Sequence, residues 1–279
     1  MTRESIVVLK FGGELLEDQA WLQTAVAAVA RIVADGPDAL VIVHGGGREI
    51  DAALRVAGIE KRQVEGLRIT DEATLDVVVS VIAGTVNTRV VAALTTAGVP
   101  AVGLTGADGA CGLAEAAPPH ETVDGGSIDL GRVGLPIDEA DMRLLHTLLG
   151  EQFVPVIACI GVGRDGQLFN VNADTFAGHV AARLRARRLI IAGTTPGVLD
   201  EAGATVPVLE PAAVARLVAS GTATAGMIAK LRACEQAIAA GVGDVVIIDG
   251  RDGSAIEAAA TGALPANATR LVSTKQLVI

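Results

Sequence analysis

The chain has 279 residues, of which 51% are hydrophobic and only 2% aromatic, and its formal net charge is −10. This length is sufficient for one large α/β domain or for two fused lobes that share a core. The charge and the scarcity of aromatic rings argue against a nucleic-acid partner, because phosphate backbones need a basic surface and unpaired bases need aromatic faces. Small phosphorylated ligands are still allowed, since local lysines and backbone N–H groups hold them.

Three cysteines lie far apart, and no two of them form a CxxC pair. They are Cys111, Cys159 and Cys234. A sparse, odd set indicates reduced thiols in a cytoplasmic protein, not a disulfide frame or a zinc site. The first residues do not resemble a signal peptide. The longest uncharged stretch, between Arg89 and Asp108, contains Pro100 and is typical of a helix end followed by a strand. We therefore predict no membrane span and no metal site built from side chains.

Short apolar runs alternate along the chain with Ala-rich stretches of helical periodicity. Strands are predicted at Ile6–Leu9, Leu40–Val43, Val64–Ile69, Pro100–Leu104, Val154–Ile160, Leu189–Ala192 and Val245–Asp249. Helices are predicted at Asp18–Ala34, Glu49–Ala57, Thr70–Ala97, Asp138–Leu149, Asp174–Arg187, Pro211–Ser220 and Met227–Ala240. Residues 109–135 are rich in Gly, Pro and polar groups and predict loops or hairpins. Strands joined by helices imply an α/β fold, a three-layer αβα sandwich with a mainly parallel central sheet. A basic cluster at 185–188 indicates a break between lobes of residues 1–185 and 186–279.

Two glycine motifs each follow a predicted strand and precede a helix. In the first, Lys10 stands before Gly12 and Gly13, so backbone N–H groups and a lysine charge can converge on an anion. The alternative is a plain turn with a solvent-reaching lysine. In the second, His44 precedes Gly45, Gly46 and Gly47, and such a run suits close approach by a ligand. A hydrolase oxyanion hole would need a GxSxG elbow, which the chain lacks. His44 itself is interpreted as structural.

Three further segments carry candidate polar groups. Arg68 lies in Gly66–Asp71 and could hold a carboxylate with two parallel N–H donors, or it could be a surface arginine paired with Asp71 or Glu72. Asn170 and Asn172 alternate onto one strand face and suit an amide-bearing substrate, while Asp174 could orient cations or cap a helix. Lys230 follows Gly226 in the first turns of a helix and could equally be an exposed lysine. The GxGxxG match at Gly161–Gly166 precedes an extended segment, so it predicts a hairpin and not a dinucleotide site.

These motifs, in this order, resemble the amino-acid kinase family, and most closely its acetylglutamate kinase branch. The matching segments are KFGG, VIVHGGG, GLRITD, AGTVNTRVV, VGLTGADG, GQLFNVNAD and GMIAKL. The resemblance covers nearly the whole chain. It implies an amino-acid-kinase-like fold and ATP-dependent phosphorylation of the side-chain carboxylate of N-acetyl-L-glutamate in arginine biosynthesis. It also implies a homodimer and Mg²⁺ held mainly by the ATP phosphates.

The resemblance further implies a role for each matching residue. Lys10 and Lys230 would stabilise the phosphoryl group in transfer, and Asp174 would hold both lysines. The acyl-amino acid would bind Gly45, Gly46, Gly47, Arg68, Asn170 and Asn172 in the N-terminal lobe, which would also dimerise. ATP would bind Lys10, Gly12, Gly13, Thr194, Gly197, Leu199 and Lys230, with its adenine in the C-terminal lobe.

The chain departs from the family pattern at two places. Thr194 stands where the nucleotide segment Gly193–Leu199 usually has an acid, and Ala268 precedes Thr269 where a glycine is usual. Two other readings stay open. One is a sister kinase for another acyl-amino acid, such as carrier-bound aminoadipate, which would favour a basic rim. The other is a non-catalytic amino-acid sensor, which loss of Lys10, Lys230 or Asp174 would have favoured.

Overall fold

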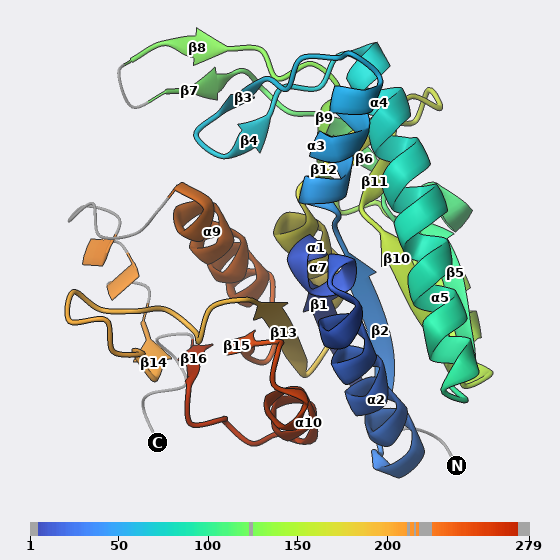
Figure 1. Cartoon of the computed structure of the whole chain (residues 1–279), viewed down its shortest axis with the longest axis vertical. Coiled ribbons are helices and arrows are strands. Elements are labelled where there is room, and N and C mark those ends of the chain that lie inside the picture. The colour runs from blue at the N-terminus through green and yellow to red at the C-terminus, as the bar shows by residue number, and fades with distance from the viewer. Residues whose placement is uncertain (1–4, 123–124, 211–212, 215, 218–224, 273–279) are drawn as a thin grey trace.

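An eight-stranded sheet forms the centre of the computed structural model, which describes residues 5–122, 125–210, 213–214, 216–217 and 225–272 (Figure 1). In spatial order its strands are β14 (Val208–Leu209), β16 (Ala268–Leu271), β15 (Val245–Asp249), β13 (Arg188–Gly193), β1 (Ile6–Phe11), β2 (Ala39–His44), β10 (Val154–Ala158) and β5 (Ala101–Thr105). Neighbouring strands are parallel except for the β15–β16 pair, which is antiparallel. The predicted mainly parallel sheet is confirmed.

Helices cover both faces of this sheet, which confirms the αβα sandwich (Figure 1). On one face, α2 (Gln19–Asp35) packs between α5 (Asn87–Thr96) and α10 (Gly253–Thr261). On the other, α7 (Ala173–Arg183) packs against α9 (Ala225–Ala239), and α6 (Arg143–Gly150) lies on β10. The strands can be apolar throughout because both of their faces are covered.

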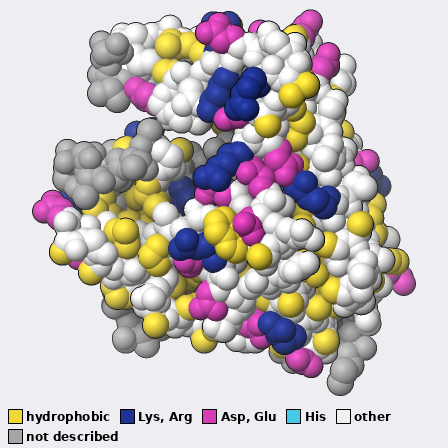
Figure 2. Space-filling view, viewed as in Figure 1, with side chains coloured by type: hydrophobic (Ala, Val, Ile, Leu, Met, Phe, Trp, Pro, Cys, Tyr) yellow, Lys and Arg dark blue, Asp and Glu magenta, His cyan; other side chains and the backbone are white. Residues whose placement is uncertain are grey.

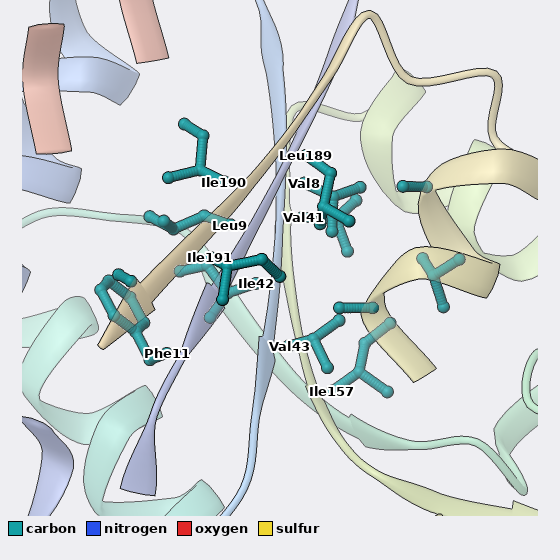
Figure 3. Packing of buried hydrophobic residues seen from close by; sticks show 14 of the residues in the cluster. Val8, Leu9, Phe11, Val41, Ile42, Val43, Ile157, Leu189, Ile190 and Ile191 are labelled. Carbon is teal, nitrogen blue, oxygen red and sulfur yellow. The ribbon is translucent and has the colours of Figure 1, made fainter. Parts of the chain in front are cut away.

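The core is centred on the three middle strands, β13, β1 and β2 (Figure 3). Val8, Leu9, Val41 and Ile190 are completely buried there, and Ile191 nearly so. Each fully buried aliphatic side chain of this size contributes about 1.5–3 kcal/mol relative to an exposed one. The β-branched residues also suit the pleated strand, so local preference and burial favour the same structure.

A smaller sheet and two hairpins stand beyond the central sheet, at the top of Figure 1. Its strands are β11 (Ile160–Val162), β12 (Leu168–Val171), β9 (Val133–Pro136) and β6 (Ala114–Ala116). The hairpins are β3–β4 (Gln63–Val64 and Leu67–Arg68) and β7–β8 (His120–Glu121 and Ser127–Ile128). The GxGxxG segment forms the β11–β12 hairpin, as predicted, and Gly163 N–H donates to the Gln167 carbonyl over 2.7 Å.

The long helix predicted over Thr70–Ala97 is present, but a π-helical segment interrupts it. It consists of α4 (Glu72–Val79), η1 (Ser80–Val86) and α5. Among the described residues, Glu72–Thr96 is also the one helical stretch long and apolar enough to cross a membrane by composition. Its inner face packs on β5, β10 and α2, as expected for a helix of a folded core. Three further short helices are α1 (Gly13–Glu17), α3 (Gly47–Val56) and η2 (Asp108–Ala110).

Several predicted boundaries were wrong for local reasons. The expected strand at Val64–Ile69 is broken by a tight turn, with φ values of 45° at Glu65 and 83° at Gly66. The helix expected from Asp138 begins only at Arg143. The helix expected to reach Arg187 ends at Arg183, because Arg185 adopts a φ of 52°. Strands β14 and β16 and helix α10 had no predicted counterpart. The predicted helix Pro211–Ser220 falls largely on residues outside those described.

Candidate active site

The candidate site lies at the carboxyl ends of β1, β2 and β13, where ligands bind in open α/β sheets. The strand order changes direction between β1 and β13, since the chain passes from β1 toward β2 and from β13 toward β15 on the opposite side. The loops that follow β1 and β2 lie at this edge of the sheet. These two loops are the glycine motifs, and they touch each other. A Cβ added to Gly13 would lie 2.8 Å from Gly46 Cα, closer than any real side chain allows. The contact therefore requires glycine and brings the starts of α1 and α3 together.

Lys10, Asp174 and Lys230 form a buried cluster beside these loops. Lys10 Nζ lies 2.7 Å from Asp174 Oδ1, and Lys230 Nζ donates to Asp174 Oδ2 over 2.9 Å. The three side chains are 9%, 11% and 16% exposed, respectively. They come from β1, α7 and α9, so three distant segments converge on one carboxylate. The alternative readings of the lysines as surface groups are therefore wrong.

The charges of this cluster depend on one another. Burial would raise the pKa of Asp174, but Lys10 and Lys230 outweigh it and hold that pKa well below its usual range. Burial lowers the pKa of Lys10, and Lys230 adds to this, while Asp174 acts in the opposite direction. One carboxylate thus allows two ammonium groups to remain close together in a site with little water.

Arg68 reaches this site from β4 and carries an unused donor. Its Nη2 atom donates to Asp51 on α3 and to the Gly47 carbonyl over 3.3 Å. The sequence suggested a partner at Asp71 or Glu72, and that alternative is wrong. Asp51 also accepts from Lys61 over 2.7 Å; these two cations outweigh burial and hold the pKa of Asp51 below its usual value. Nη1 of Arg68 is buried without a hydrogen-bond partner among the described residues. An anionic ligand group would satisfy it.

A cavity of about 250 Å³ lies between Lys10, the two glycine loops and Arg68. Its lining includes Lys10, Gly13, Gly45, Gly46, Gly47, Arg68, Cys159, Asn170 and Asn172. Asn170 donates to Thr70 Oγ1 over 3.1 Å, while Asn172 accepts from the N–H groups of Asp174 and Thr175 and so caps α7. Capping and lining the cavity therefore coexist in Asn172. Figure 2 shows the same face hollowed beneath the hairpins, with Lys and Arg side chains near the inner end of the hollow.

The segment Gly193–Leu199 follows β13, beside the first glycine motif. Gly12 N–H donates to the Ala192 carbonyl over 2.9 Å. Thr194, which stands where an acid was expected, donates its hydroxyl to Glu14 over 2.6 Å. Gly197 adopts a φ of 71° and packs directly on Thr269 of β16. The buried Thr269 hydroxyl accepts from Val198 N–H over 2.8 Å and donates to the Val206 carbonyl over 2.7 Å.

A side-chain metal site is absent from the described part of the chain, where no three His, Cys, Asp or Glu side chains cluster. Both carboxylate oxygens of Asp174 are engaged by lysines, so this carboxylate is better suited to position cations than to ligate a metal. The donor set instead fits a polyanion. Both α1 and α3 begin at the glycine motifs, and the N–H groups before Leu15 and Glu49 have no intrahelical acceptor. Leu15 N–H donates to the Gly12 carbonyl and Glu49 N–H to Glu17.

Sequence reasoning missed four residues that shape this site: Glu14, Asp51, Asn87 and Cys159. Glu14 and Asp51 are partners of residues that it did identify, but their contacts link segments far apart in the chain. Asn87 lies in the AGTVNTRVV segment, which was matched to the family without a role for this residue. Cys159 lines the cavity as an uncharged thiol, because burial raises its pKa to about 12.

The chain belongs to the amino acid kinase family, whose pattern it matches over residues 5–249. A curated relative, the acetylglutamate kinase of Methylobacterium nodulans, is 42% identical over 253 residues; the match covers 89% of this chain and 82% of the relative.

Two solved structures share the fold. One is N-acetylglutamate synthase from Neisseria gonorrhoeae complexed with coenzyme A and N-acetyl-glutamate, with a TM-score of 0.80 and 24% identity. The match covers 97% of this chain but only 60% of that longer one. The other is carbamate kinase from Giardia lamblia bound to AMP-PNP, with a TM-score of 0.70 and 16% identity over 98% of this chain and 100% of that one.

Proposed function

We propose that this chain transfers the γ-phosphoryl group of ATP to the side-chain carboxylate of N-acetyl-L-glutamate, a reaction of arginine biosynthesis. The observation that carries the proposal is the buried cluster in which Asp174 holds Lys230 together with Lys10, and Lys10 lines the cavity. The identity to curated acetylglutamate kinases supports the choice of acceptor. The products are ADP and an acyl phosphate.

The chemistry requires charge stabilisation and no general base. A free side-chain carboxylate has a pKa of about 4.3, so it is already a nucleophile near neutral pH. One of its oxygens bonds to the γ-phosphorus while the bond from phosphorus to the bridging oxygen of ADP breaks. Negative charge then spreads over the transferred group, and Lys10 and Lys230 stabilise it from within a poorly hydrated site. Mg²⁺, held mainly by the ATP phosphates, would supply further positive charge.

The acceptor is held in the cavity beside Arg68. Its α-carboxylate takes the unsatisfied Nη1 donor of Arg68, which Asp51 keeps in place. Asn170 and Asn172 face its amide group, and the Gly45–Gly47 loop lines the path to the transferred phosphate. A buried donor without a partner costs about 1–3 kcal/mol, and binding of the carboxylate removes that cost.

Each of the two parts of the chain binds one of the two substrates. Residues 1–185 bind the acyl-amino acid, and residues 186–279 bind the nucleotide through Thr194, Gly197 and Leu199, with Gly12 and Gly13 at its phosphates. The anchoring of Gly193–Leu199 by Thr269 supports this division, since a fixed loop is preorganised for a ligand.

The other readings have less support. A carrier-bound aminoadipate would favour a basic rim, but Arg48 and Lys61 near the cavity are paired with Glu14 and Asp51. A sensor without catalysis does not need two lysines held on one buried carboxylate. The experiment that decides is a hydroxamate assay with ATP, Mg²⁺ and a panel of acyl-amino acids. Product with N-acetylglutamate supports the proposal; product only with another acceptor would reassign the substrate, and no product with any would favour the sensor.

We also propose a cytoplasmic homodimer formed by the N-terminal lobe. The outward face of α4, η1 and α5 supports it, because exposed positions such as Ala73, Gly84 and Ala92 are small and uncharged. Light scattering at several protein concentrations tests the dimer. A charged substitution at the open surface of Gly84, such as Gly84→Glu, is expected to yield monomers, and a monomeric wild type would contradict the proposal.

A further inference from the structure

The π-helix η1 packs directly on the second glycine loop. A Cβ added to Gly46 would lie 2.9 Å from Ile82 Cγ2 and 3.3 Å from Val86 Cγ2. Both of these residues belong to η1. A π-helical turn shifts the register of the residues after it, and such turns occur frequently at functional sites. Here the residue delivered to the site by the shift is Asn87, at the start of α5.

Asn87 joins two buried acceptors beneath the loop. Its Nδ2 atom donates to the Val156 carbonyl over 2.8 Å and lies 3.0 Å from Nε2 of His44. His44 is completely buried, and its Nδ1 atom lies 3.1 Å from the Gly45 carbonyl. The amide orientation is fixed, because a flipped Asn87 would turn its oxygen toward the Val156 carbonyl oxygen. His44 Nε2 must therefore accept, and Nδ1 must be protonated and donate a hydrogen bond to the Gly45 carbonyl.

We propose that Asn87 and His44 are positioning residues for phosphoryl transfer, and that they set the orientation of the Gly45 peptide in the Gly45–Gly47 loop. The chain of donors runs from Asn87 through one neutral imidazole tautomer to the Gly45 carbonyl. The loop whose first carbonyl is held in this way lines the cavity with Gly45, Gly46 and Gly47. The inference rests on the proposed function, since the loop lines the acceptor site.

The environment of His44 keeps this imidazole neutral. Burial lowers the pKa of His44 to about 4, and Arg89 on α5 also lowers it. The residues paired beside it on β1 and β10 are Phe11 and Ala158, which carry no charge. The tautomer is therefore constant around neutral pH, and the loop geometry does not vary with pH in the wild type.

The isosteric variant Asn87→Asp tests the donor chain. A carboxylate cannot donate to His44 Nε2, so the imidazole has to carry two protons to keep its bond to Gly45. The variant is expected to lose activity as pH rises through a raised His44 pKa, while the wild type has a flat profile there. At the upper end of the pH range, the kcat of the variant should fall about 10²-fold, which is the scale expected when a catalytic loop is misplaced by about 1 Å. The KM for ATP should change little.

Two controls separate positioning from stability. Thr74→Val replaces a buried hydroxyl of the same long helix by a methyl group, and it should change thermal stability without altering the pH profile. If Asn87→Asp does not fold, the ¹⁵N NMR spectrum of the wild-type histidine rings gives the tautomer of His44 directly. The His44 signals are assigned by their absence from the spectrum of His44→Gln. A protonated Nδ1 supports the proposal.

Two results would overturn it: an Nε2–H tautomer in the wild type, or an Asn87→Asp enzyme whose pH profile has the wild-type shape. Neither depends on which acyl-amino acid is the acceptor, because the most active acceptor of the hydroxamate panel is used. A wild type that is inactive with every acceptor would contradict the proposed function instead, and the spectrum would still report the tautomer.

Discussion

Replacement of Asp174 by asparagine is the sharpest test of the lysine cluster. D174N keeps the size of the side chain and removes its charge, so the two lysines, bound at 2.7 and 2.9 Å in the wild type, would repel each other without compensation. Removal of one partner from a buried ion pair costs about 3–5 kcal/mol. The three side chains are at most 16% exposed, so water screens this loss only weakly. The loss is limited because Lys10, whose pKa burial already lowers, can release its proton.

The expected catalytic result follows from the same change. Removal of one preorganised charge-stabilising group lowers kcat by about 10²–10³-fold, and D174N disturbs two lysines at once, so we expect about 10³-fold. The assay is acyl phosphate trapped as hydroxamate, measured over a range of pH. As pH rises, Lys10 loses its proton and activity declines. This decline should begin at a lower pH in D174N than in the wild type, because the pKa of Lys10 falls further without Asp174.

Stability supplies an independent measurement with a defined sign. The pKa of Asp174 is lower in the folded chain than in the unfolded chain, where it has its ordinary value of 3.8. Its ionised form therefore adds to the free energy of unfolding above pH 3.8, and this contribution is lost as pH falls through the pKa of the folded state. The difference in unfolding free energy between the wild type and D174N should therefore shrink in acid.

Asp244→Asn is the matched control for D174N. Asp244 is a buried carboxylate that bridges Arg188 and Arg270 at the far end of the sheet. The Asp244→Asn enzyme should be less stable than the wild type but should keep the wild-type kcat. A D174N enzyme with wild-type kcat would refute the role of the cluster in phosphoryl transfer.

Three further predictions concern the rest of the site. Arg68→Ala should raise the KM for N-acetylglutamate by about 10²-fold, the value of a charge-assisted bond, and leave the KM for ATP unchanged; an effect confined to ATP would contradict the assignment. Thr269→Val removes the hydroxyl that fixes Val198 and should raise the KM for ATP about tenfold in steady-state kinetics, whereas an effect only on the acceptor would place this segment elsewhere. The buried thiols, whose pKa values burial raises to about 12, should resist iodoacetamide in the folded protein and react after unfolding; rapid labelling of the native protein would show that they are accessible.

Local pattern was sufficient for the framework of the fold. Apolar runs such as Ile6–Leu9 and Val245–Asp249 became central strands, because a strand buried on both faces needs continuous apolar sequence. What failed was set by single backbone conformations. The left-handed φ of Glu65 turns the expected strand into a hairpin, and a glutamate at this position does not predict that conformation. The π-helix likewise packs against Gly46, which is distant in the sequence, and the local sequence does not show this contact.

The residue patterns identified the site residues singly, and the family resemblance supplied one of their connections. From the patterns alone, Lys10 and Lys230 each kept a surface alternative and Asp174 a helix-capping one; only the resemblance implied that Asp174 holds both lysines. Asp51 was missed, since an acid inside an amphipathic helix reads as a solvent-facing group. It is the hairpin carrying Arg68 that folds over α3 and gives Asp51 its role.

The central position of β1 has a consequence for folding. This strand pairs with β2 on one side and with β13 on the other, so it is shared by both parts of the chain. A fragment of residues 186–279 would leave the β13 edge open, with Leu189, Ile190 and Ile191 exposed along it. Unpaired apolar edges recruit other strands, so such a fragment is expected to aggregate unless residues 1–185 are supplied with it. The strand that carries Lys10 thus makes residues 186–279 dependent on residues 1–185 for a closed sheet edge.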